Sequence, residues 1–87
     1  MNMLPLGSVV LLKDATKKLM IYGRFQMNLK DNGIYDYVGC LYPEGNLAPD
    51  AAFIFNNEDI QEVIFEGYVN KEEIDYINAI QEVIDSD

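Results

Sequence analysis

The most regular alternation of apolar and polar residues runs from Leu19 to Met27, and it predicts a β-strand. One face of this strand carries apolar residues and a glycine, namely Leu19, Ile21, Gly23, Phe25 and Met27. The other face carries Met20, Tyr22, Arg24 and Gln26. Because Gly23 has no side chain to pack, we expect a bulge or a bend at this position.

Three shorter runs of β-forming residues predict further strands. They are Val9–Lys13, Tyr35–Tyr42 and Phe53–Phe55. Turn signals separate them: Asp14–Lys17 ends the first, Asp31–Gly33 supplies residues that tolerate a positive φ, and Tyr42–Gly45 combines proline with glycine. The run from Tyr35 should therefore fold back as the antiparallel neighbour of the strand that ends at Met27.

The segment between residues 56 and 68 supports two interpretations. One is a helix capped by Asn56 or Asn57, because isoleucine and valine follow at helical spacing. The other is a helical turn at Glu58–Ile60 followed by a strand at Glu62–Tyr68, because valine, isoleucine and phenylalanine adjoin there. We favour the helical turn and the strand.

The C-terminal segment predicts a helix over Lys71–Ile84. Asn70 is a suitable N-cap, and Glu73 lies three residues on, as in a capping box. Val69 and Ile74 are placed as a hydrophobic staple. An apolar stripe follows the helix and consists of Ile77, Ile80 and Ile84, flanked by Tyr76 and Val83. We expect this stripe to pack on the sheet.

These elements predict one α+β domain over residues 1–87, with a β-rich unit at 1–68 and a C-terminal helix and tail at 69–87. The expected architecture is a small antiparallel β-sheet or SH3-like half-barrel of about five strands with a C-terminal α-helix. An open five-stranded sheet with the helix across one face is the alternative. Both arrangements bury the same residues.

The net charge of −9 belongs to the second half of the chain, where from Glu44 onward twelve carboxylates face a single lysine, Lys71. Such a balance argues against binding to nucleic acid or to an anionic membrane surface. It either confers solubility or steers a basic partner. No run reaches the roughly 18 apolar residues of a membrane span, and the start of the chain lacks the pattern of a signal peptide, so we expect a cytoplasmic protein.

The sequence offers little for catalysis. It contains no histidine, and the lone Cys40 is expected to be a small buried apolar side chain. The two carboxylate clusters, Glu58-Asp59-Glu62 and Glu72-Glu73-Asp75, lack the spacing of a calcium loop and fit a helix start and a solvated face. We therefore expect no catalytic residue, no cofactor and no metal site.

Surface for protein contact remains. Met20, Tyr22 and Tyr42 are the candidate partner-binding residues, because exposed tyrosine and methionine are favoured at interfaces. The same side chains could equally form a satellite core beneath the helix. A free edge of the sheet offers a second mode of binding, by strand addition.

Five stretches together resemble a small bacterial family called domain of unknown function 4176. They are residues 4–13, 17–24 and 35–45, and the pair 55–60 and 63–68. The resemblance covers nearly the whole chain. It departs from the family pattern at Asp14-Ala15, where glycine is expected, and at Asn57, where histidine is expected.

This resemblance implies a setting, since members are found mainly in Gram-positive bacteria beside genes for type VII secretion, WXG-type small proteins and LXG-domain toxins. It implies a cytoplasmic, non-enzymatic accessory, a chaperone or targeting adaptor that acts on an LXG-type effector or a WXG-like partner. The alternative is an immunity protein that neutralises a secreted toxin, which the acidic second half favours. The family defines no catalytic residues to carry over.

Overall fold

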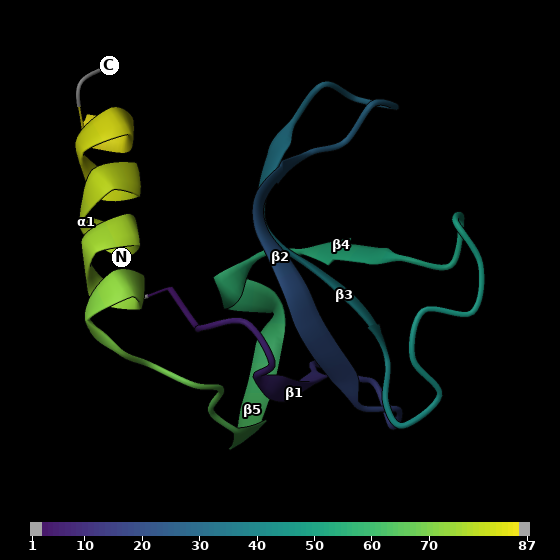
Figure 1. Ribbon diagram of the computed structural model, residues 1–87. Coiled ribbons are helices and arrows are strands. Elements are labelled where there is room, and N and C mark those ends of the chain that lie inside the picture. The colour runs from purple at the N-terminus through teal and green to yellow at the C-terminus, as the bar shows by residue number, and fades with distance from the viewer. Residues whose placement is uncertain (1–2, 86–87) are drawn as a thin grey trace.

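In the computed structural model, which describes residues 3–85, five strands form one antiparallel sheet and a helix follows them (Figure 1). The elements are β1 (Val9–Leu12), β2 (Leu19–Met27), β3 (Ile34–Leu41), β4 (Phe53–Phe55), the 3-10 turn η1 (Asn57–Asp59), β5 (Ile60–Phe65) and α1 (Lys71–Asp85). The strands lie in the order β4-β3-β2-β1-β5, so β4 and β5 are the two edges of an open sheet. The predicted α+β fold class is confirmed.

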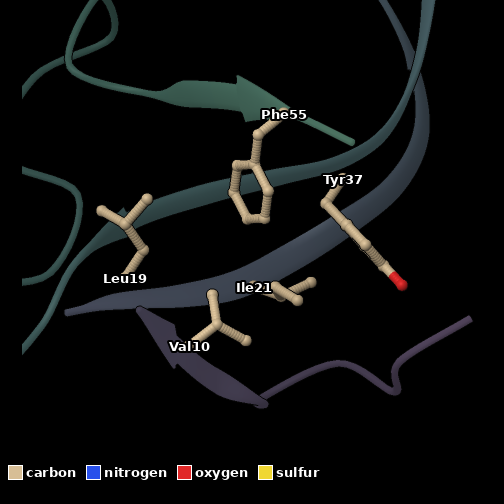
Figure 2. Packing of buried hydrophobic residues seen from close by; sticks show 5 residues of the cluster. All are labelled: Val10, Leu19, Ile21, Tyr37 and Phe55. Carbon is tan, nitrogen blue, oxygen red and sulfur yellow. The ribbon is translucent and has the colours of Figure 1, made fainter. Parts of the chain in front are cut away.

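The core lies on one face of the sheet, which we call the inner face. Figure 2 shows its five central side chains, contributed by four strands: Val10, Leu19, Ile21, Tyr37 and Phe55. Three of them, Val10, Ile21 and Tyr37, are completely buried, although α1 contributes no buried residue. A single flat layer cannot bury side chains in this way, so the sheet curls around its own core, and Met3 and Leu4 pack against it.

The predicted bulge at Gly23 is present, and it reverses the faces of the rest of β2. Ile21 is paired with Gly39 and Gly23 with Val38, so one residue of β2 is left over. A Cβ on Gly23 would lie 2.6 Å from Val38 Cγ1, so any other residue here would force the Val38 side chain to move.

As a result Arg24 pairs with Tyr37 and is buried on the inner side, while Met27 is half exposed. The prediction that Phe25 and Met27 continue the face of Leu19 and Ile21, with Arg24 on the other face, is wrong. A bulge of one residue shifts the alternation by one position.

The favoured interpretation of residues 56–68, a helical turn followed by a strand, is confirmed, but the boundaries of both elements differ from the predicted ones. The helical turn is η1, and β5 ends at Phe65, three residues before the predicted end. The strand stops because the chain meets the N-terminal segment at Gly67, whose N–H donates to Ser8 Oγ at 3.0 Å. A Cβ on Gly67 would lie 2.0 Å from the backbone oxygen of Leu6, so only glycine fits this close approach.

The C-terminal helix forms where the sequence predicts it, and Asn70 caps it. Asn70 Oδ1 accepts a hydrogen bond from the Glu73 N–H at 3.1 Å. In the predicted capping box, the Glu73 carboxylate would accept a hydrogen bond from the backbone N–H of Asn70. Instead it binds Arg24 of β2. Glu73 thus contributes its backbone to the cap and its side chain to a tertiary contact.

The predicted packing of α1 on the sheet is wrong. None of its residues is buried, and the helix stands beside the sheet (Figure 1). The reason is that the inner face is already closed by the curl of the sheet and by Met3 and Leu4, which leaves no face for the stripe to cover. The stripe residues Ile77, Ile80 and Ile84 are half-buried, whereas the flanking Tyr76 and Val83 are exposed.

Two further findings concern the single cysteine and the question of a membrane span. Cys40 is a free, buried cysteine in β3, as predicted. Within residues 3–85, no helix is both long enough and apolar enough to cross a membrane.

Candidate protein-binding surfaces

A row of side chains crosses four strands on the face opposite Val10 and Ile21, which we call the outer face. Its members are cross-strand neighbours in the order Phe65, Val9, Met20 and Cys40. Cross-strand neighbours point to the same side of a sheet, so the row is continuous from the edge strand β5 to β3. Val9 and Cys40 are buried, Met20 is half-buried, and the β5 end of the row is open, since Phe65 is 62% exposed.

A shallow groove of about 450 Å³ follows this row, and we call it the outer groove. Its lining is almost entirely apolar and consists of Gly7, Val9, Lys18, Met20, Tyr42, Ile64 and Phe65. Ile64 occupies the extra position of a register shift between β1 and β5, and it is 42% exposed. Two of the three candidate residues, Met20 and Tyr42, therefore meet in one groove with two apolar residues of an edge strand.

The third candidate, Tyr22, lies in a different place. It lines a groove of about 580 Å³ between β2 and α1, which we call the helix groove. Three tyrosines contribute to this groove, together with charged and polar side chains; the lining is Leu6, Tyr22, Gly23, Arg24, Gln26, Tyr68, Asn70, Glu72, Glu73 and Tyr76. The structure thus separates Tyr22 from Met20 and Tyr42.

Arg24 holds the two walls of the helix groove together. Its guanidinium binds both carboxylate oxygens of Glu73, with the Nη2 to Oε1 distance at 2.9 Å, and Nη1 also donates to the backbone oxygen of Leu4 at 3.3 Å. The same group lies 5.2 Å from the ring centroid of Tyr76, within reach of a cation–π contact. Because the Arg24 and Glu73 side chains are 4% and 15% exposed, this is a nearly buried ion pair.

Tyr37 anchors the N-terminal segment beneath these surfaces. Its hydroxyl accepts a hydrogen bond from the Leu4 N–H at 2.9 Å and donates to Asn57 Oδ1 at 3.0 Å. Burial of the ring raises the pKa of Tyr37 above its usual 10.0. Asn57, at the position where the family resemblance leads one to expect histidine, thus has a structural role as an acceptor.

The charged groups around the outer groove are partly paired. Lys17 and Glu44 form a salt bridge of 2.7 Å beside the turn that carries Tyr42. This hydrogen bond lowers the pKa of the Glu44 carboxyl below 4.5. Across residues 3–85, no group of three or more Cys, Asp and Glu side chains gathers in a way that could hold a metal ion.

Sequence reasoning missed Ile64, Phe65 and the Arg24–Glu73 pair. The first two belong to a run of valine, isoleucine and phenylalanine that looks like any core strand. Only the edge position of β5 leaves them exposed, and strand order was not predicted. The alternation of apolar and polar residues in β2 places Arg24 on the wrong face, because the bulge shifts this alternation by one residue. No local pattern in the sequence indicates that Glu73 is its partner.

Comparison with known proteins gives one match, to a family model. The model, described as a domain of unknown function (DUF4176), matches residues 3–76, which covers the whole sheet and the first turns of α1. No curated protein and no solved structure gives a significant match. Since the match spans most of the chain, this protein belongs to the family of domain of unknown function 4176.

Proposed function

We propose that this protein is a non-enzymatic protein-binding accessory of a type VII secretion system, acting in the cytoplasm as a chaperone or targeting adaptor. Its partner is an LXG-type effector or a WXG-like small helical protein. The secretion setting comes from the family resemblance alone. The binding role rests on one observation, the outer groove in which Met20 and Tyr42 meet the exposed Ile64 and Phe65.

The outer groove has the composition of a docking surface. Tyr42, Ile64 and Phe65 are each more than two fifths exposed, and they adjoin the buried Val9. Covering a partly exposed side chain of this size contributes about 1–2 kcal/mol. An aromatic pair beside a methionine is typical of the centre of an interface.

Docking through side chains is favoured over strand addition. The pairing of β5 with β1 contains two register shifts, which bend the edge, and β5 carries Glu62 with Glu66 directly after it. Bulges and charges of this kind protect an edge strand from pairing with another chain. The opposite edge, β4, is only three residues long.

One observation favours the alternative function of an immunity protein. Helix α1 carries five carboxylates and a single lysine, Lys71, so the C-terminal part of the molecule presents a strongly acidic surface. An acidic surface can cover the basic active site of a toxin and steer its association.

Two assays separate these functions. The tagged chain is co-expressed in turn with each protein encoded beside its gene, and the partner is identified by co-purification. The accessory function predicts recovery with an LXG or WXG-type protein and loss of effector export after deletion. Recovery of a free monomer with unchanged export contradicts it, and protection of cells against the toxin in a growth-rescue assay supports the immunity function in its place.

A further inference from the structure

The helix groove continues along α1 into a second, wholly apolar hollow. This hollow of about 280 Å³ is lined by Phe25 of β2 and by four residues of α1, Tyr76, Ala79, Ile80 and Val83. Tyr76 lines both hollows, so they form one continuous surface along the helix. The apolar part spans about two helical turns, or roughly 10 Å.

Tyr76 and Val83 of this surface are 51% and 61% exposed, and Phe25 and Ile80 are half-buried. No residue of α1 is fully buried, and a helix of 15 residues with so little packing is only marginally stable in water. The helix is attached near its start, by the contacts of Arg24 with Glu73 and Tyr76. A partner seated against its later turns would therefore stabilise the helix as well as bury the stripe.

The charges beside the apolar residues of this surface indicate what kind of partner fits it. Helical spacing places Asp75 and Glu82 along one flank of Tyr76, Ala79 and Val83, and Glu72 at the N-terminal end of the same face. Asp75 is paired with Lys71 at 2.8 Å, whereas Glu72 contacts only the amide of Asn70 and Glu82 has no ion-pair partner among the described residues. The flank is therefore negative and solvent-exposed.

These charges argue against a second copy of this chain as the occupant. Each copy carries a net charge of −9, and a symmetric contact would set one acidic flank against the other. An extended peptide is also a poor fit. It would need free backbone N–H and C=O groups to pair with, and those of a helix are already hydrogen-bonded within the helix.

We infer that the surface formed by Phe25, Tyr76, Ala79, Ile80 and Val83 binds a basic amphipathic helix of a partner protein. The apolar stripe of that helix packs against Ile80 and Phe25, in the manner of a helix in a groove. Its lysine or arginine side chains face Glu72 and Glu82.

The test uses the full chain and a synthetic probe. The probe is a fluorescein-labelled peptide of leucine and lysine, with leucine at positions i, i+3, i+4 and i+7 of each repeat, and its binding is followed by fluorescence anisotropy at physiological salt. The same peptide with every lysine replaced by glutamate is the control ligand. We expect binding of the basic peptide only.

Two variants with the same change in charge locate the site. Ile80→Asp places a carboxylate in the stripe, whereas Asn78→Asp places one on the opposite side of the same helix turn. We expect Ile80→Asp to weaken binding about tenfold or more, and Asn78→Asp to leave it within about twofold. Circular dichroism checks that both variants keep the helix, and Glu72→Gln with Glu82→Gln should weaken binding without touching the apolar stripe.

Several outcomes overturn the inference: no binding of the basic peptide, equal binding of the acidic peptide, or equal effects of Ile80→Asp and Asn78→Asp. A concentration-dependent dimer in sedimentation equilibrium that Ile80→Asp abolishes assigns the stripe to a second copy, and it contradicts the inference too. The inference rests on the proposed protein-binding function. Because its probe is a synthetic peptide, failure here leaves the co-purification assay of that function unaffected.

Discussion

Arg24 of β2 and Glu73 of α1 form the one ion pair that joins the sheet to the helix within residues 3–85. The contact uses both carboxylate oxygens, and Arg24 is also bonded to the backbone of Leu4. Sheet, helix and N-terminal segment therefore meet at one guanidinium. This group therefore ties the start of the helix to the sheet.

Replacing Glu73 by glutamine should loosen the helix. The change leaves the Arg24 guanidinium nearly buried without its counter-ion, and we expect a loss of about 2 kcal/mol in the free energy of unfolding, less than for a fully enclosed pair because Glu73 is 15% exposed. Chemical denaturation measures the loss. Glu72→Gln is the matched control, because Glu72 contacts only Asn70, and it should be nearly neutral. Equal effects of the two variants would show that the pair has no structural role.

Amide hydrogen exchange should be slow in the sheet and fast in α1, with the change in rate at the linker between them. The amides of Ile21 and Tyr37 lie in fully buried parts of β2 and β3, and they should exchange only through global unfolding. Those of α1 should exchange much faster, because the helix lacks packing. Glu73→Gln should accelerate exchange in α1 more than in the strands. Equal protection in the helix and the sheet would contradict the account of α1 as a loosely attached element.

Sequence patterns predicted the existence of these elements better than their relations. The strands, the helical turn and the Asn70 cap depend on spacing within a few residues, and such local signals are readable in a single chain. The orientation of Arg24 depends on a bulge, whose effect on the faces cannot be known before the register is known. The position of α1 depends on whether the sheet closes on itself, which is a property of the whole fold.

Gly67→Ala should destabilise the fold although the change adds only one methyl group. The new Cβ would lie 2.0 Å from the Leu6 backbone oxygen, and the hydrogen bond from Gly67 to Ser8 would be disturbed as the chain moved away. We expect a loss of about 2 kcal/mol or more in thermal or chemical unfolding.

Gly33→Ala is the control for this change. The nearest atoms to its Cβ would be side-chain atoms of Asp31 and Tyr35 in an exposed turn, at 3.0 Å and beyond, and not backbone atoms as at Gly67. We expect an effect under about 0.5 kcal/mol. If Gly67→Ala were as mild as Gly33→Ala, the close approach of the linker to the N-terminal segment would be refuted.

Tyr37 should make the fold sensitive to alkali. Its pKa is raised above 10.0 by burial, so the folded state keeps the phenol proton at a pH where the unfolded chain releases it. The stability that this proton provides is complete below about pH 10 and is lost as the pH rises through the folded-state pKa. Tyr37→Phe should be less stable at neutral pH, because Leu4 and Asn57 lose a partner, yet its stability should fall less steeply above pH 10.

The measurement is the free energy of unfolding as a function of pH, with tyrosinate absorbance as a direct readout of ionisation. Tyr68→Phe is the control, since Tyr68 is 79% exposed, and its curve should follow that of the unmodified protein. Parallel curves for Tyr37→Phe and the unmodified protein would contradict the role given to burial.

The candidate site was also predictable only in part. Met20 and Tyr42 could be chosen as contact residues from their types and their places in the strand pattern, and the structure does bring them together. Tyr22 has the same residue type and spacing, but it lies at the bulge and lines the helix groove instead. Ile64 and Phe65 look like core residues until strand order places them at an edge.

The central claim is that the outer groove binds a partner protein, and a matched pair of variants in the co-purification assay tests it most directly. Phe65→Asp places a charge in the groove on β5, and Ile54→Asp makes the same change of an exposed apolar residue on β4, at the opposite edge of the sheet. The account predicts that Phe65→Asp abolishes recovery of the LXG or WXG-type partner while Ile54→Asp retains it, with both variants folded by circular dichroism. Retention of the partner by Phe65→Asp, or its equal loss in both variants, would contradict the claim.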